Sequence, residues 1–191
     1  AMAVSAAACG GSDDNTGGGG AAPEKTFEAG TTMERLHKAQ KITIGTKFDQ
    51  PGFGLKGLDG KPAGFDVEIG KIIAEELGIP EDKIEWVETQ SAVREQVIED
   101  GKVDIVVATY TINDKRKERV DFAGPYYVAG QHIMVRADDN SITGPDSFKD
   151  GTKKVCSVTN STPANNIKKY LANEAQQLVL FGGYQECVDA L

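Results

Sequence analysis

The sequence is poor in the residues that many enzymes and nucleic-acid-binding proteins rely on. Its 191 residues include two histidines and three cysteines, and 29 acidic residues against 21 lysines and arginines give a net charge of −8. This acidity argues against a nucleic-acid partner. No apolar run approaches the length of a bilayer-spanning helix. A hydrophobic content of 39% still supports a packed core, in one domain or two small ones.

The three cysteines are expected to have different roles. Cys9 follows the small residues 6–8 and resembles the lipidated cysteine at the end of a bacterial lipoprotein signal, with a free thiol in a flexible tail as the alternative. The start of such a signal is missing, so we expect a clipped N-terminus. Cys156 and Cys187 form an even pair. They should be a disulfide if the chain is exported and two buried thiols in a reducing compartment.

The hydrophobic pattern predicts an α/β protein with two lobes joined by a short crossover. We expect a signal remnant at 1–9, a flexible tether at 10–30, lobe 1 at 31–125, the crossover at 126–131 and lobe 2 at 132–191. The second lobe ends inside a helix, which indicates a truncated chain.

The elements expected in lobe 1 are helices at 33–39, 66–77, 91–100 and 114–119, and strands at 41–46, 84–88 and 103–108. Phe65, Ile69, Ile72, Ile73 and Leu77 should form the inner face of the second helix, and Val93, Val97 and Ile98 that of the third. The elements expected in lobe 2 are strands at 131–136, 154–158 and 177–181, and helices at 163–173 and 184–191.

Strands and helices alternate in lobe 1, as in doubly wound sheets. Ligands of such sheets bind outside the carboxyl ends of the strands. We therefore expect residues 47–53, 89–94 and 109–116 to surround one crevice.

Residues 103–127 contain the most informative part of this crevice. A strand ends in hydroxyl and amide side chains just before a helix, where unpaired backbone N–H groups attract anions. Arg116, one turn into that helix, carries a planar fork of donors suited to a carboxylate. The alternative is an ordinary strand–turn–helix with Arg116 in solvent.

This segment resembles the motif of the bacterial extracellular solute-binding proteins, family 3, D-x-x-x-x-G-x-T-I-T-x-x-R-x-x-x-x-x-F-S-x-P-Y. The matching residues are Asp104, Thr111, Ile112, Arg116, Phe122, Pro125 and Tyr126, whereas Thr109, Asn113 and Ala123-Gly124 depart from it. The resemblance implies a two-lobe periplasmic-binding-protein-like fold (type II) and a monomeric receptor for an ABC importer. That receptor would lie outside the cytoplasm, deliver a polar amino acid to a membrane permease, and be anchored to the outer face of the membrane only through lipid on Cys9.

The resemblance also implies which residues bind the amino acid. Arg116 and Thr111 would hold the α-carboxylate, and the Thr109 carbonyl would accept from the ammonium group. In lobe 2, Ser161 and Thr162 would lie at a helix start, with Thr162 as the cap. Pro163 lacks an N–H, which removes one donor there.

Arg94 is expected to decide the substrate. Glutamate- and aspartate-binding members of the family carry Arg at the same distance before Gly101, so the resemblance implies glutamate, with aspartate or glutamine next. A solvent-facing Arg94 is the alternative. Lys47 could add positive charge or lie on the rim, and Phe53 could shelter the ligand or belong to the core. The FDQPG loop at 48–52, with the two later cysteines, is similar to actinobacterial glutamate-binding lipoproteins.

An enzyme or a sensor domain on the same fold is the rival hypothesis. His37 and His132 lie outside the predicted crevice, so no Cys/His or Ser/His pair is available there. Glu68, Glu88 and Glu95 are expected at solvated ends of helices or strands. We therefore predict a binding protein that is not an enzyme and uses no cofactor and no metal.

Overall fold

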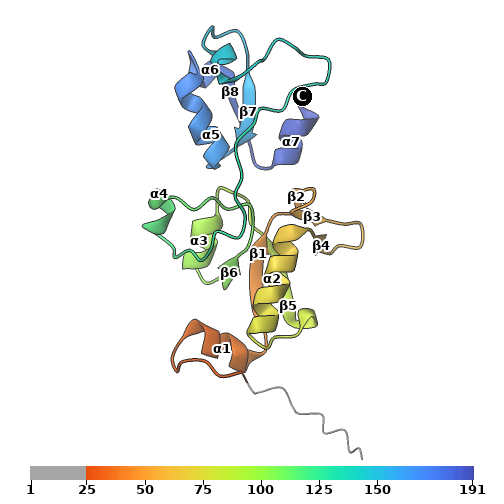
Figure 1. Ribbon diagram of the computed structural model, residues 1–191, viewed down its shortest axis with the longest axis vertical. Helices are drawn as coiled ribbons and strands as arrows, with labels where there is room; N and C mark the ends of the chain where they lie inside the picture. Colours follow the sequence, from red (N-terminus) through yellow and green to blue (C-terminus); the bar gives the residue numbers. More distant parts are fainter. Residues whose placement is uncertain (1–24) are drawn as a thin grey trace, which may run out of the picture.

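The computed structural model describes residues 25–191, which form two α/β units, each built on a parallel sheet (Figure 1). The first unit comprises the elements from α1 to α4, and the second those from β7 to α7, with the short helix η2 ahead of them. Cys9 and residues 10–24 of the predicted tether lie outside the described residues. The packed part of the chain already includes Phe27, which lies against the core of the first unit.

The first unit is organised around β1 (Ile42–Thr46). It pairs in parallel with β5 (Ile84–Glu88) on one side and β6 (Ile105–Val106) on the other, as the alternating pattern predicted. Ile42 and Ile44 of the central strand are completely buried. Since the three strands are parallel, their carboxyl ends lie at one edge of the sheet.

The remaining elements of the first unit flank this sheet. They are α1 (Thr32–Ala39), α2 (Phe65–Glu76), the 3-10 helix η1 (Glu81–Lys83), α3 (Arg94–Glu99), α4 (Asp114–Lys117), and an antiparallel sheet of β2 (Asp49–Gln50), β3 (Gly54–Lys56) and β4 (Pro62–Ala63). The predicted helix at 33–39 is confirmed, with the Thr31 hydroxyl accepting from the N–H of Glu34 at its start.

The inner face of α2 matches the prediction in part, since Leu77 is buried and Ile69 and Ile73 pack against the core. Phe65 and Ile72 are 40% and 53% exposed, and the buried positions include Val67, Gly70 and Ala74. A Cβ at Gly70 would lie 2.6 Å from the Trp86 ring of β5. At Gly70 the helix approaches the sheet so closely that no side chain fits between them.

Other predictions for the first unit also need correction. The strand expected at 103–108 is limited to Ile105–Val106, and the helix expected at 91–100 covers only Arg94–Glu99. Val93 is exposed rather than inward, because it precedes the first residue of α3 instead of lying within the helix. The helix expected at 114–119 ends at Lys117.

The second unit contains the parallel pair β7 (Val155–Val158) and β8 (Leu178–Phe181). Its helical elements are η2 (Pro145–Phe148), α5 (Thr162–Ile167), η3 (Lys168–Tyr170), α6 (Glu174–Gln177) and α7 (Tyr184–Asp189). A disulfide joins Cys156 of β7 to Cys187 of α7, which confirms the predicted pair.

Two predicted elements of the second unit are altered. The helix expected at 163–173 stops at Ile167, because the chain tightens into η3 and becomes extended at Leu171. Residues 131–136 form no strand. Within the described part of the chain their backbone pairs with no other strand, and an apolar alternation cannot form a ladder without one.

None of the helices in residues 25–191 combines the length and the apolar character that crossing a membrane requires.

Gly70→Ala tests the close contact between α2 and the sheet. The added methyl group meets the Trp86 ring, so we expect the free energy of unfolding to fall by about 1 to 2 kcal/mol despite the better helix propensity of alanine. Gly144→Ala is the control, since a Cβ there meets nothing within 4 Å. Chemical denaturation of both variants measures the difference. An unchanged or raised stability of Gly70→Ala would show that the helix does not approach the sheet this closely.

Candidate functional site

Three loops meet at the carboxyl edge of the first sheet. The N–H of Thr89 donates to the Thr46 carbonyl at 2.7 Å, and the Thr109 hydroxyl donates to the Gln50 amide oxygen. Arg94 joins two of these loops by donating to the carbonyls of Thr89 and Thr109, at 3.3 and 3.1 Å. The convergence expected from strand order is therefore present.

Arg116 lies at the centre of this region. The Asn113 side chain caps α4 by accepting from the N–H of Arg116, and the guanidinium turns inward. Its Nη1 donates to the Thr111 carbonyl at 2.8 Å, and its Nε donates to Glu95 at 3.1 Å. Arg116 is buried, which excludes the solvated alternative.

Glu95 was expected at a solvated helix end, and that expectation is wrong. Its side chain is buried and pairs with Arg116. The pairing brings together residues 21 positions apart, one from α3 and the other from α4. No spacing rule within one helix indicates such a partner, so the sequence alone gave no signal for it.

Arg94 is the most deeply buried cation of the site after Lys47, with 1% of its surface exposed. Its Nη2 has no hydrogen-bond partner, and no carboxylate of the described residues lies within ion-pair distance of it. Burial, and then the charge of Arg116, lower the pKa of Arg94 to about 10. The solvent-facing alternative is therefore excluded.

Tyr110 lies close to both arginines. The guanidinium carbons of Arg94 and Arg116 are 5.2 and 4.7 Å from its ring centre, which is within the range of cation–π attraction. Burial raises the pKa of the Tyr110 hydroxyl, which has no hydrogen-bond partner of good geometry. The ring offsets part of the repulsion between two like charges.

Buried polar side-chain atoms without a hydrogen-bond partner are concentrated here. Within residues 25–191 they are Thr46 Oγ1, Asp66 Oδ2, Arg94 Nη2 and Tyr110 Oη, whereas Lys47 Nζ and Asp49 Oδ1 make no hydrogen bond of good geometry but form an ion pair with each other. Such atoms are rare in folded proteins because leaving them unpaired costs free energy. Their gathering at the carboxyl edge of one sheet, and at the start of α2, is what a site for a small polar ligand requires.

The structure decides between the alternatives that the sequence left open for the surroundings of Lys47, and it shows which aromatic rings contact Phe53. Lys47 is completely buried rather than on the rim, and its Nζ lies 2.9 Å from a carboxylate oxygen of Asp49. Phe53 packs edge-on against Phe65 and Tyr127. The structure thus gives both residues protein partners.

In the second unit, Ser161 caps α5 and Thr162 is its first residue, so the predicted cap is off by one. Ser161 has the extended backbone that a cap requires, and its hydroxyl accepts from the N–H of Ala164. The Thr162 hydroxyl and the Asn160 carbonyl instead accept from Arg116, each at 3.3 Å. Arg116 therefore contacts both units.

No group of three or more histidine, cysteine and carboxylate side chains in the described residues could hold a metal ion. His37 donates to the Leu77 carbonyl, and His132 is exposed. Neither lies at the edge formed by the three loops.

Comparison with known families agrees with this geometry. The model of the bacterial extracellular solute-binding proteins, family 3, matches residues 42–180. The chain belongs to this family.

The relatives of this chain in family 3 include proteins named for the binding of different amino acids. It is 44% identical over 154 residues to the glutamate-binding protein GluB of Corynebacterium efficiens, covering 78% of this chain and 51% of the relative. It is 38% identical over 165 residues to a glutamine-binding protein of Geobacillus stearothermophilus, covering 85% and 62%. The chain thus spans about half to three fifths of the length of these relatives, which are solute-binding proteins rather than enzymes by name.

Solved structures show the same α/β binding-protein fold. An ancestral arginine-binding protein bound to glutamine superposes with a TM-score of 0.73 at 34% identity, over 80% of this chain and 64% of that one. AncCDT-1, an ancestral amino acid-binding protein described as a precursor of cyclohexadienyl dehydratase, gives a TM-score of 0.76 at 30% identity, over 83% and 68%.

Asp66 provides a test of the buried polar cluster. Burial raises the pKa of its carboxyl group, although a hydrogen bond from the Tyr126 hydroxyl at 2.8 Å opposes the shift. A raised pKa means that the carboxyl group of Asp66 binds its proton more tightly in the folded chain than in the unfolded chain, where the pKa of Asp is about 3.9. Its contribution to stability is therefore complete below that pH and is lost as the pH rises through the raised value.

We expect the melting temperature of Asp66→Asn, relative to the parent, to increase from about pH 3.5 to about pH 7, because asparagine stays neutral. Asp82→Asn, at an exposed position, is the control. Thermal unfolding across this range measures the difference between each variant and the parent. A difference that is the same at both ends of the range would contradict a burial penalty at Asp66.

Proposed function

We propose that the protein is the substrate-binding receptor of an ABC importer for a polar amino acid, and that this amino acid is glutamate. Family membership and the named relatives support the receptor role. The cluster of unpaired buried polar atoms at the carboxyl edge of the first sheet supports a small polar ligand.

Arg94 is the observation that favours glutamate. A buried guanidinium without a carboxylate partner is costly, by several kcal/mol. A ligand with a side-chain carboxylate removes that cost by pairing with the free Nη2. Glutamine has the same shape but no charge, so it would leave Arg94 without a counter-ion. Aspartate carries the charge on a side chain shorter by one methylene group.

The α-carboxylate of the ligand is assigned to Arg116, together with the Thr111 amide and hydroxyl. The guanidinium now donates to Asn160 and Thr162, and the carboxylate would replace those weaker acceptors. The Thr109 carbonyl accepts from Arg94 and has a second lone pair for the ammonium group.

The second unit offers Thr162 rather than Ser161 to the ligand. The Ser161 hydroxyl is committed to the N–H of Ala164 and to Ser157, and it is buried. The Thr162 hydroxyl faces Arg116 across the cleft. Lys47 would act on the ligand through Asp49, and Phe53 through its packing with Phe65 and Tyr127, rather than by direct contact.

The receptor would act outside the cytoplasm, where its disulfide is stable. We propose a monomer anchored by lipid on Cys9, with lobe 1 at 31–125, lobe 2 at 132–191 and closure about the crossover at 126–131. The closed form would be recognised by a membrane permease.

An enzyme on this fold is the second candidate, and AncCDT-1 provides the reason to test it. The described cleft residues include no histidine beside a nucleophile, which favours binding over catalysis. Incubation with each bound amino acid, followed by mass spectrometry, separates the two. Conversion of a bound amino acid to a product would overturn the binding-protein assignment.

The Arg94 assignment predicts a loss of substrate preference. In the protein expressed from its complete gene, Arg94→Ala should weaken glutamate binding at least 30-fold, about 2 kcal/mol, and should abolish the preference for glutamate over glutamine. Isothermal titration calorimetry with glutamate, aspartate, glutamine and arginine measures both effects.

Arg119→Ala is the matched control, since Arg119 forms an exposed ion pair with Glu99 on the outer side of α3. It should bind glutamate as the parent does. Tight binding of glutamine by the parent would leave the family role intact and show that Arg94 does not select the ligand. Absence of binding to any amino acid would contradict the receptor role.

A further inference from the structure

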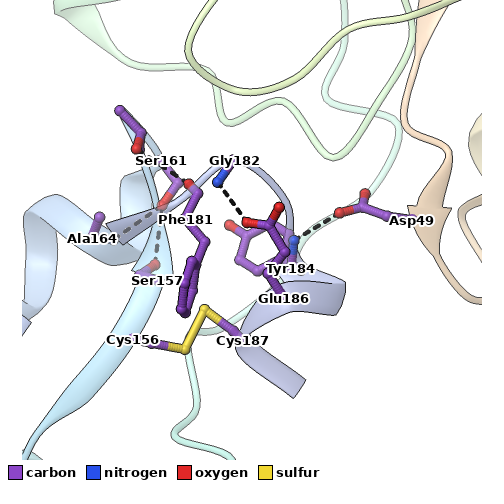
Figure 2. The surroundings of a disulfide bond; sticks show 11 residues. Asp49, Cys156, Ser157, Ser161, Ala164, Phe181, Gly182, Tyr184, Glu186 and Cys187 are labelled. Atoms are coloured by element: carbon purple, nitrogen blue, oxygen red, sulfur yellow. Dashed lines mark hydrogen bonds between the residues drawn. A yellow bond between two sulfur atoms is a disulfide. The ribbon is translucent and has the colours of Figure 1, made fainter. Parts of the chain in front are cut away.

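A second contact between the two units involves Asp49 and is separate from Arg116. One carboxylate oxygen of Asp49 accepts from the backbone N–H of Tyr184 at 2.7 Å, and the other lies 2.9 Å from Lys47 Nζ. Figure 2 shows Asp49 reaching from the first unit toward the turn that precedes α7. Hydrogen bonds to ionised acceptors are about twice as strong as those between neutral groups.

Gly183 makes the approach of this carboxylate possible. A Cβ at position 183 would lie 2.7 Å from the Asp49 oxygen, well inside contact distance. The backbone angles of Gly183 (φ −128°, ψ 160°) suit any residue, so the turn itself does not need a glycine. The missing side chain is required by the contact with the first unit.

The turn is fixed within the second unit. The N–H of Gly182 donates to the Glu186 carboxylate at 3.0 Å, and the disulfide joins α7 to β7 (Figure 2). Lys47, on the other side of the contact, lies 5.8 Å from the centre of the Tyr184 ring. Each partner of the contact is therefore held by its own unit.

We propose that Asp49 and the backbone of Gly183 and Tyr184 form an inter-unit clasp that favours the closed arrangement of the two units even without a ligand. The hydrogen bonds of Arg116 to Asn160 and Thr162 measure 3.3 Å each, whereas the Tyr184 N–H and the Asp49 carboxylate are paired more closely, at 2.7 Å. The clasp sets the fraction of molecules with a closed cleft, and the apparent affinity is proportional to that fraction. Only this last effect depends on the proposed function.

Gly183→Ala tests the clasp without removing a charge, and Gly182→Ala is its matched control. A Cβ at Gly182 meets only the end of the Gln90 side chain, at 3.4 Å. We expect Gly183→Ala to increase the radius of gyration in small-angle X-ray scattering without ligand, and to speed exchange of the Tyr184 amide hydrogen by about tenfold or more. Gly182→Ala should match the parent in both measurements.

Asp49→Asn provides a second variant of unchanged size, and it should also open the cleft. The double variant Asp49→Asn/Gly183→Ala should be no more open than Asp49→Asn alone, because Asp49→Asn already weakens the contact with Tyr184, together with the Lys47 ion pair, and Gly183→Ala acts on that contact alone. Parent-like scattering and Tyr184 exchange in Gly183→Ala, or fully additive effects in the double variant, would overturn the clasp. Both measurements are made without ligand, so a failure to bind glutamate would contradict the proposed function and leave the clasp standing.

Discussion

The buried ion pair between Glu95 and Arg116 is the interaction around which the cleft is arranged. α3 supplies the carboxylate and α4 the guanidinium, and both side chains are buried. An unpaired charge at this depth would cost several kcal/mol. Because Glu95 balances it, Arg116 can stay between its own loop and the start of α5 while it contacts both units.

The three buried cations of the candidate site, Lys47, Arg94 and Arg116, have different surroundings. Lys47 faces Asp49 and Arg116 faces Glu95, so each has a protein carboxylate. Within residues 25–191, Arg94 donates hydrogen bonds only to neutral carbonyls, and it lies near the ring of Tyr110. A protein that buries one cation in this way is suited to a ligand that brings the missing negative charge.

Features set by local chemistry or strand order could be predicted, and features set by distant contacts could not. The strand at 41–46, the capped helix after Thr31 and the meeting of three loops follow from pattern and topology. The close approach of α2 to the sheet depends on Trp86 in strand β5. The burial of Glu95 in α3 depends on Arg116 in α4. Ser161 and Thr162 are both suitable caps, and only the backbone geometry selects Ser161.

The disulfide also determines how the second unit transmits force. Cys187 follows Tyr184 by three residues, and its partner lies 31 positions earlier in the central part of β7. A force that displaces Tyr184 is therefore passed through the disulfide to β7, so α7 does not detach from the sheet alone. The disulfide therefore lets the second unit move as one rigid body when the turn at Tyr184 is displaced.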